Sequence, residues 1–209
     1  MKHLFQWAVA LVIAATVTSC TVHQEFSFKE GYSGKSVNTV DLSTMRLLLP
    51  KFDSSRTFTD VQDSVLNYTR RLADTLKRID GVRAVDYDWN DSAAVMRLSY
   101  RFSNLESLNK AFLVTNPGKC NKGKTCFSHR WRRFAFHAPH FINEKELQEI
   151  APSERNHFQY TLDLVFPKAV RGAEGQVKVS KGKRRVSYRG NLLETFSKDS
   201  RGNFDIKTR

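Results

Sequence analysis

The segment TDVQDSVLNYTRRLADTLKRIDGVRAVDYDWNDSAAVMRLSYRF, residues 59–102, decides the fold class because it predicts a helix followed by two strands. In its first half, apolar residues recur every three or four positions, which places them on one helical face. They are Val61, Val65, Tyr68, Leu72, Leu76 and Ile79. Thr59 and Gln62 predict the capping box that begins this helix, and Gly81 predicts its end. We expect the apolar face to pack on a sheet.

The second half of the segment alternates apolar and polar residues, which is typical of strands. Val85, Tyr87 and Trp89 share one face, Asn90–Asp91 turns the chain, and Met96–Phe102 alternates on the return. Strands joined by such tight turns pair antiparallel. We therefore predict an α+β domain in which a curved, mainly antiparallel sheet has helices packed on one face.

The same reasoning extends to both sides of this segment. The further elements that we expect are a hairpin over 22–41, a helix over Leu42–Leu49 that ends before Pro50, a helix capped by Ser103 and Glu106 that carries Leu105, Leu108 and Phe112, a strand over Arg130–His137, a helix over Glu144–Ile150, a strand over Phe158–Phe166 and a hairpin over Gln176–Tyr188. The end of the chain is polar, with Phe204 and Ile206 as its only late apolar pair, and we expect a loosely ordered tail over residues 190–209.

The N-terminus has the three parts of a secretory signal. Lys2 and His3 precede the apolar run Leu4–Val17, which is too short to remain as a membrane-spanning helix. Val17-Thr18-Ser19-Cys20 then resembles the bacterial lipobox, in which the cysteine is acylated and becomes the first residue of the mature chain. We predict a lipoprotein signal peptide over 1–19, lipidation at Cys20, and one α+β domain over 20–209. The alternative is an ordinary signal peptide followed by a chance cysteine.

The residue after Cys20 bears on the membrane that holds the protein. Thr21 stands there instead of an aspartate, which would favour retention at the inner membrane. We expect attachment to the outer membrane on its periplasmic side. Two or three acyl chains would hold the protein firmly, whereas one chain gives only marginal binding.

The chain is strongly basic. Without Lys2 it has 33 lysines and arginines against 21 acids, a net charge of +12. This field favours anionic partners. For a lipoprotein these are lipid headgroups, lipid A phosphates or an envelope protein, and we expect no nucleic acid. The alternative is a generally basic, solvated surface.

Two basic segments are candidates for binding an anionic surface. The first segment, Arg130–Arg133, has three arginines around Trp131. Arginine and tryptophan side chains are both favourable among the lipid headgroups of a membrane. Basic residues among aromatics also occur in nucleic-acid binding, but export favours the membrane. The candidate residues are Arg130, Trp131, Arg132, Arg133, Lys181, Lys183, Arg184 and Arg185.

The remaining cysteines, Cys120 and Cys126, predict a disulfide, because an exported protein meets an oxidising compartment. His129, His137 and His140 lie near by, but their spacing matches no known ligand pattern. We expect neither a metal site nor another cofactor.

The order of these features resembles that of uncharacterised lipoproteins from Bacteroidetes and, more distantly, LppM-type lipoprotein domains. The segments that carry the resemblance follow Cys20 and are Glu25–Phe28, Glu30–Gly34, Asp41–Met45, Ile79–Val82 and Tyr100–Asn109. Tyr32 stands where that group often has serine. The resemblance implies an α+β fold and a place in the cell envelope, and it implies no reaction.

The sequence has no nucleophile elbow, phosphate-binding glycine loop or zinc-protease helix motif. Three functions stay open. The first is a non-enzymatic module that binds a lipid or another apolar or anionic envelope ligand. The second is a protein–protein interaction subunit of an envelope assembly, and the third is a hydrolase whose site the sequence does not reveal. The first two are favoured, and a deep apolar cavity would distinguish the first from the second.

Overall fold

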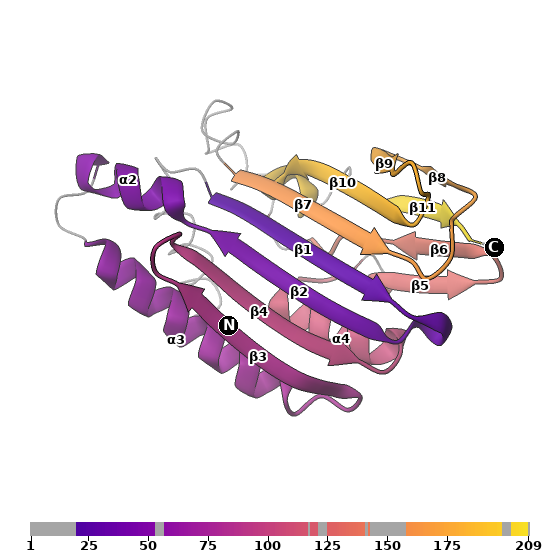
Figure 1. Ribbon diagram of the computed structural model, residues 1–209, viewed down its shortest axis with the longest axis horizontal. Coiled ribbons are helices and arrows are strands. Elements are labelled where there is room, and N and C mark those ends of the chain that lie inside the picture. The colour runs from indigo at the N-terminus through magenta and orange to yellow at the C-terminus, as the bar shows by residue number, and fades with distance from the viewer. Residues whose placement is uncertain are drawn as a thin grey trace.

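The hairpin that begins at Cys20 forms the centre of a seven-stranded sheet (Figure 1). The computed structural model describes residues 20–52, 57–116, 118–120, 125–140, 142, 158–197 and 202–208. The strands of the large sheet, in spatial order, are β3 (Val82–Asn90), β4 (Val95–Phe102), β2 (Gly34–Asp41), β1 (Cys20–Phe28), β7 (Phe158–Val165), β10 (Arg185–Asn191) and β9 (Val177–Val179).

All neighbours in this sheet pair antiparallel except β1 and β7. The predicted hairpins over 22–41, 85–102 and 176–188 are confirmed, since each is closed by a short turn. The parallel pair places Cys20 beside Phe158, and it joins two strands that are far apart in sequence.

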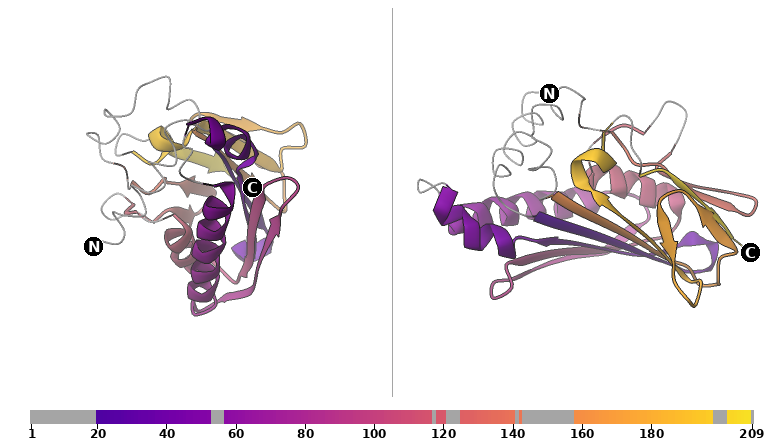
Figure 2. Two further views of the ribbon diagram at one scale, coloured as in Figure 1. Left: turned by 90° about the vertical axis from the view of Figure 1, so that its left-hand side faces the viewer. Right: turned by 90° about the horizontal axis from the view of Figure 1, so that it is seen from above.

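A second sheet of four strands lies behind one end of the first (Figures 1 and 2). Its order is β5 (Phe127–Arg130), β6 (Arg133–Phe136), β11 (Phe204–Lys207) and β8 (Gly172–Glu174). The strand expected over Arg130–His137 is present as β6, with Phe134 and Phe136 buried on one face, but it is shorter than expected because Trp131 and Arg132 form a tight turn that separates it from β5. The tail is also more ordered than we expected, since Phe204 and Ile206 are buried in β11.

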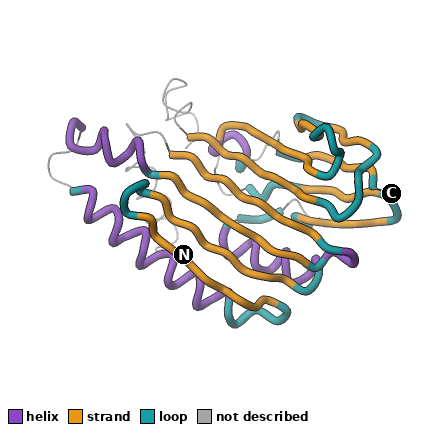
Figure 3. Tube along the Cα trace, in the orientation of Figure 1, coloured by secondary structure: helices purple, strands orange, loops and turns teal. Residues whose placement is uncertain are grey.

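Four helices are described, and α3 and α4 lie on the inner face of the large sheet (Figure 3). They are α2 (Ser43–Phe52), α3 (Phe58–Leu76), α4 (Leu105–Thr115) and α7 (Leu192–Thr195), with a short 3-10 turn at Glu30–Tyr32. The α+β architecture is therefore as predicted. The helix expected over Glu144–Ile150 falls outside the described residues.

The helix ends differ from the sequence prediction in detail. Thr57 caps α3 in a capping box with Asp60, two residues before the box that we expected. Asn104 caps α4 through Ser107, one residue after the expected cap. The backbone of α2 stays helical past Pro50, so the proline removes one donor without ending the helix.

Aromatic rings fill the space between the two sheets. Phe127 of β5 lies 5.1 Å from Phe26 of β1, 4.9 Å from Phe112 of α4 and 5.1 Å from Phe136 of β6, between ring centroids. Phe134 extends the cluster to Phe28 at 5.2 Å. The core that joins sheet, helix and second sheet is thus packed with side chains.

The predicted disulfide between Cys120 and Cys126 is present, with the two Cα atoms 5.9 Å apart. The two cysteines are six positions apart in the sequence, and the loop that they close lies immediately before β5. Cys126 is buried beside Phe127, so the bridge fixes the entry of the chain into the second sheet.

Candidate anion-binding surface

The two basic turns that were predicted separately lie at the same end of the molecule. The backbone N–H of Val170 donates to the carbonyl of Lys183 at 2.7 Å. The next residue, Arg171, donates to the carbonyl of Lys207 at 2.7 Å, and the residue after Lys207 donates to the carbonyl of Arg132 at 2.8 Å. These hydrogen bonds connect the β9–β10 turn to the β5–β6 turn. Nearly fifty residues of sequence separate the two turns.

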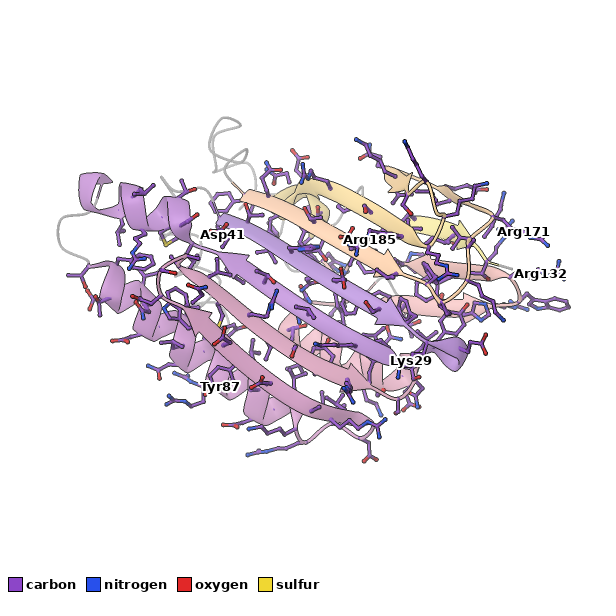
Figure 4. The ribbon with its side chains drawn as sticks, in the orientation of Figure 1. Lys29, Asp41, Tyr87, Arg132, Arg171 and Arg185 are labelled. Atoms are coloured by element: carbon purple, nitrogen blue, oxygen red, sulfur yellow. A yellow bond between two sulfur atoms is a disulfide. The ribbon has the colours of Figure 1, made fainter. Side chains whose placement is uncertain are left out.

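Exposed cations lie on these two turns and on neighbouring segments at the same end of the molecule, and we call this region the basic end. Its members are Lys29, Arg130, Arg132, Arg133, Lys168, Arg171, Lys181, Lys183 and Arg184. Figure 4 labels Lys29, Arg132 and Arg171 toward the same right-hand side. Lys168 pairs with Glu30 at 2.8 Å. The other eight form no ion pair with a described acid, so the basic end keeps a positive field.

Trp131 stands at the tip of the β5–β6 turn with 87 % of its surface exposed. Its φ is +60°, a left-handed conformation that suits glycine and costs other residues about 1–2 kcal/mol. The indole therefore projects into solvent from a backbone conformation that is unfavourable for tryptophan. Arg130 and Arg132 precede and follow it in the sequence.

Arg185 is separate from the other seven predicted residues. It lies on the outer face of the large sheet, where Figure 4 labels it. Its Nη1 is 2.6 Å from Oδ2 of Asp163 and 3.0 Å from Oε2 of Glu25. The alternation along β10 could have shown this, because Arg185 and Ser187 are partly exposed while the intervening residue is buried.

Asp163 is the centre of this outer-face network. His23 Nε2 lies 3.1 Å from its Oδ2, and Ser187 Oγ donates to its Oδ1 at 2.5 Å. Burial alone raises the pKa of Asp163, but hydrogen bonds from His23, Ser187 and Arg185, with the Arg185 charge, outweigh burial and lower the pKa to about 2. Ser187 donates to the carboxylate and not to the histidine, so the group lacks the serine–histidine bond that activates a nucleophile.

An Asp163→Asn substitution is expected to lower the free energy of unfolding by about 1–3 kcal/mol at pH 7, because charged hydrogen bonds are lost. The folded pKa of Asp163 lies below its ordinary 3.8, so this contribution is present above that value and is lost as pH falls toward 2. Urea unfolding at pH 7, 4 and 2.5 measures it. Asp86→Asn, an exposed acid on the same sheet face, is the control. A gap between parent and Asp163 variant that stays constant down to pH 2.5 would contradict the prediction.

Two surface hollows open at the basic end. One surrounds the turn at residues 130–133, and the other, of about 310 Å³, is lined by Lys29, Tyr32, Phe166 and Lys168 among others. The interior between the sheets is occupied by phenylalanine rings. This arrangement favours binding at the surface over enclosure of an apolar ligand.

Cys20 lies at the opposite end of β1 from the basic end (Figure 1). It is 6 % exposed and packs in an apolar cluster with Leu42, Met45, Phe158 and Leu193. Burial, helped by the Asp41 charge, raises the pKa of the Cys20 thiol to about 12. At about 3.3 Å per residue, the strand separates this cluster from the basic end by roughly 26 Å.

Comparisons with protein-family models, curated proteins and solved structures find nothing that matches this chain. Within the described ranges, none of the helices combines the length and apolar character needed to cross a bilayer. Fold and surface together define an α+β domain with an apolar cluster at Cys20 and a cationic surface at the other end of the same strand.

Proposed function

We propose that this protein is an acylated cell-envelope lipoprotein that binds an anionic envelope ligand through its basic end and catalyses no reaction. Cys20 is the acylated residue, and the protein faces the periplasm from the outer membrane. The observation that carries the proposal is that the two basic turns, at 130–133 and 180–184, lie at the same end of the molecule, where backbone hydrogen bonds of the intervening residues 170–171 and 207–208 link them.

The position of Cys20 supports the anchor. It follows a secretory signal and a lipobox-like run, and it is also the first residue of β1. Acyl chains on Cys20 would therefore begin directly at the folded domain, beside the apolar side chains of Leu42 and Met45. The resemblance to Bacteroidetes lipoproteins supports the same location.

The basic end has the positive charge and the solvent exposure that binding to an anionic surface needs. Each lysine or arginine near an anionic lipid surface contributes about 1 kcal/mol of attraction. The attraction acts within about 8 Å at physiological salt, so exposed side chains dominate. A ligand need only be anionic and accessible from outside, because the cations project from turns.

Charge reversal tests the proposal. In the mature, unacylated chain, Arg132→Glu, Lys183→Glu and Arg184→Glu together are expected to weaken binding to phosphatidylglycerol-containing vesicles about 100-fold or more. The matched control is Arg70→Glu, Lys77→Glu and Arg78→Glu on exposed positions at and after α3, with the same change in net charge. Vesicle sedimentation at low and high salt measures the affinity. Equal weakening by both triple variants, or binding that salt does not reduce, would count against the basic end.

A further inference from the structure

We propose that the β5–β6 turn is a lipid-contact point, at which Trp131 enters the headgroup layer of an anionic membrane and the neighbouring arginines bind lipid phosphates. This inference rests on the proposed function, and it identifies the anionic ligand as a phospholipid surface. It assigns Trp131 a role separate from the charge of the basic end.

The exposure of Trp131 is the first observation. Large aromatic side chains of the described residues are mostly buried, including the nearby Phe134 and Phe136, which are 0 % exposed. Trp131 is 87 % exposed on the same hairpin. An indole has an apolar body and one polar N–H, which is why tryptophan concentrates at membrane interfaces. The hairpin thus presents its one interfacial side chain outward.

The shape of the turn is the second observation. Residues 131 and 132 connect β5 and β6 directly, so the tip is narrow and protrudes. The hollow beside the tip is lined by residues 130–133 of the turn alone and is open to solvent, so a soft headgroup layer can surround the tip more completely than a rigid small ligand can. The guanidinium groups of Arg130, Arg132 and Arg133 can each form paired hydrogen bonds with a phosphate.

The support under the tip is the third observation. Phe134 packs against Phe28 at 5.2 Å and Phe166 at 5.3 Å, between ring centroids. His129 lies on the ring of Tyr32 at 4.4 Å. The hairpin is therefore anchored on the core from both strands, and its tip is held in place before it meets a membrane.

Fluorescence tests the inference directly. The mature chain has two tryptophans, Trp89 and Trp131, because Trp7 lies in the signal. In an unacylated Trp89→Phe variant, phosphatidylglycerol-containing vesicles are expected to shift the emission of Trp131 to shorter wavelength, and brominated acyl chains are expected to quench it. Phosphatidylcholine vesicles should do neither. The matched control is Trp131→Phe, in which Trp89 should keep its emission.

The arms of this experiment separate the inference from the proposed function. Anionic vesicles that bind while Trp131 emission stays unchanged would overturn the lipid contact and leave the anionic ligand standing. Binding to soluble polyphosphate but to no vesicle would overturn the membrane and favour a polymer. Competition by millimolar inorganic phosphate would point to a phosphate site in place of a lipid surface. Loss of all anion binding would overturn the proposed function itself.

A stability measurement excludes a purely structural role. Trp131→Gly is expected to weaken binding to anionic vesicles about tenfold, or ~1.4 kcal/mol. The thermal midpoint should stay unchanged or rise, because glycine suits the φ of +60° and little buried surface is lost. A lowered midpoint with unchanged vesicle affinity would show that Trp131 serves the fold alone.

Discussion

Replacing Cys20 with alanine is expected to move the protein from the membrane fraction to the soluble or precursor fraction. Two or three acyl chains, at about 0.8 kcal/mol for each buried CH₂, hold a protein far more tightly than surface charge does. Without the thiol no diacylglycerol can attach, and the basic end alone would bind weakly and in a salt-dependent way. Incorporation of labelled fatty acid, followed by fractionation of the cells, measures the change.

The control for this variant replaces the two other cysteines of the chain. Cys120→Ser with Cys126→Ser removes the disulfide and should leave labelling and fractionation as they are. Cys20 packs in a small apolar cluster, so its truncation to alanine should leave the fold intact, as circular dichroism can verify. Labelled fatty acid that is still incorporated into the Cys20→Ala protein would show that the anchor is elsewhere.

The two proposed membrane contacts constrain how the domain lies. Cys20 begins β1, and the basic end lies beyond the other end of that strand, roughly 26 Å away. Acyl chains that leave the domain at Cys20 give it no linker, so the strand can pivot only about this point. When Trp131 contacts the same membrane, β1 must run along the surface and cannot stand upright on it.

The local elements of the fold could be predicted from the sequence because their signals are local. Alternation identified β1, β2, β3, β4 and β7, and helical spacing identified α3 and α4. The first residues of α3 and α4 differ from the prediction by one or two positions because the capping-box pattern expects glutamate or glutamine as the third helical residue. The chain uses Asp60 and Ser107 in that role.

The pairing of β1 with β7 and the second sheet could not be predicted in this way. The alternation of residues along a strand shows which of its faces is apolar, but it does not show which distant strand pairs with that strand. The strands of the second sheet have three or four residues each, so β11 offers only Phe204 and Ile206 as a pattern. Two alternating apolar residues in a polar tail resemble a loop until a partner strand is known.

The candidate site was partly visible in the sequence. The basic and aromatic composition of 130–133 and the basic composition of 181–185 indicate the two turns. Only the tertiary structure places them at one end of the molecule and adds Lys29 and Arg171. Arg185 continues the basic run of 183–184 in the sequence, which is why the composition predicts it as a surface residue. The pleat of β10 turns it to the outer face, where Asp163 and Glu25 bind it.

Phe127→Ala is expected to lower the free energy of unfolding by about 3–5 kcal/mol, the usual range when a buried phenylalanine is truncated. The ring is 1 % exposed and touches side chains from all three layers: Phe26 of the large sheet, Phe112 of α4 and Phe136 of the second sheet. Edge and tilted aromatic pairs add about 0.5–1.5 kcal/mol each beyond burial, and the truncation removes all three of these pairs.

Denaturant unfolding with the disulfide intact measures this loss. Leu113→Ala is the matched control on α4, because Leu113 is 37 % exposed and should cost well under half as much. Phe127→Leu should fall between them, since most of the volume is kept. The second sheet holds the Trp131 turn through this core, so Phe127→Ala should also weaken vesicle binding even where the domain stays folded. A Phe127→Ala protein as stable as the Leu113→Ala control would mean that the two sheets are not joined by these rings.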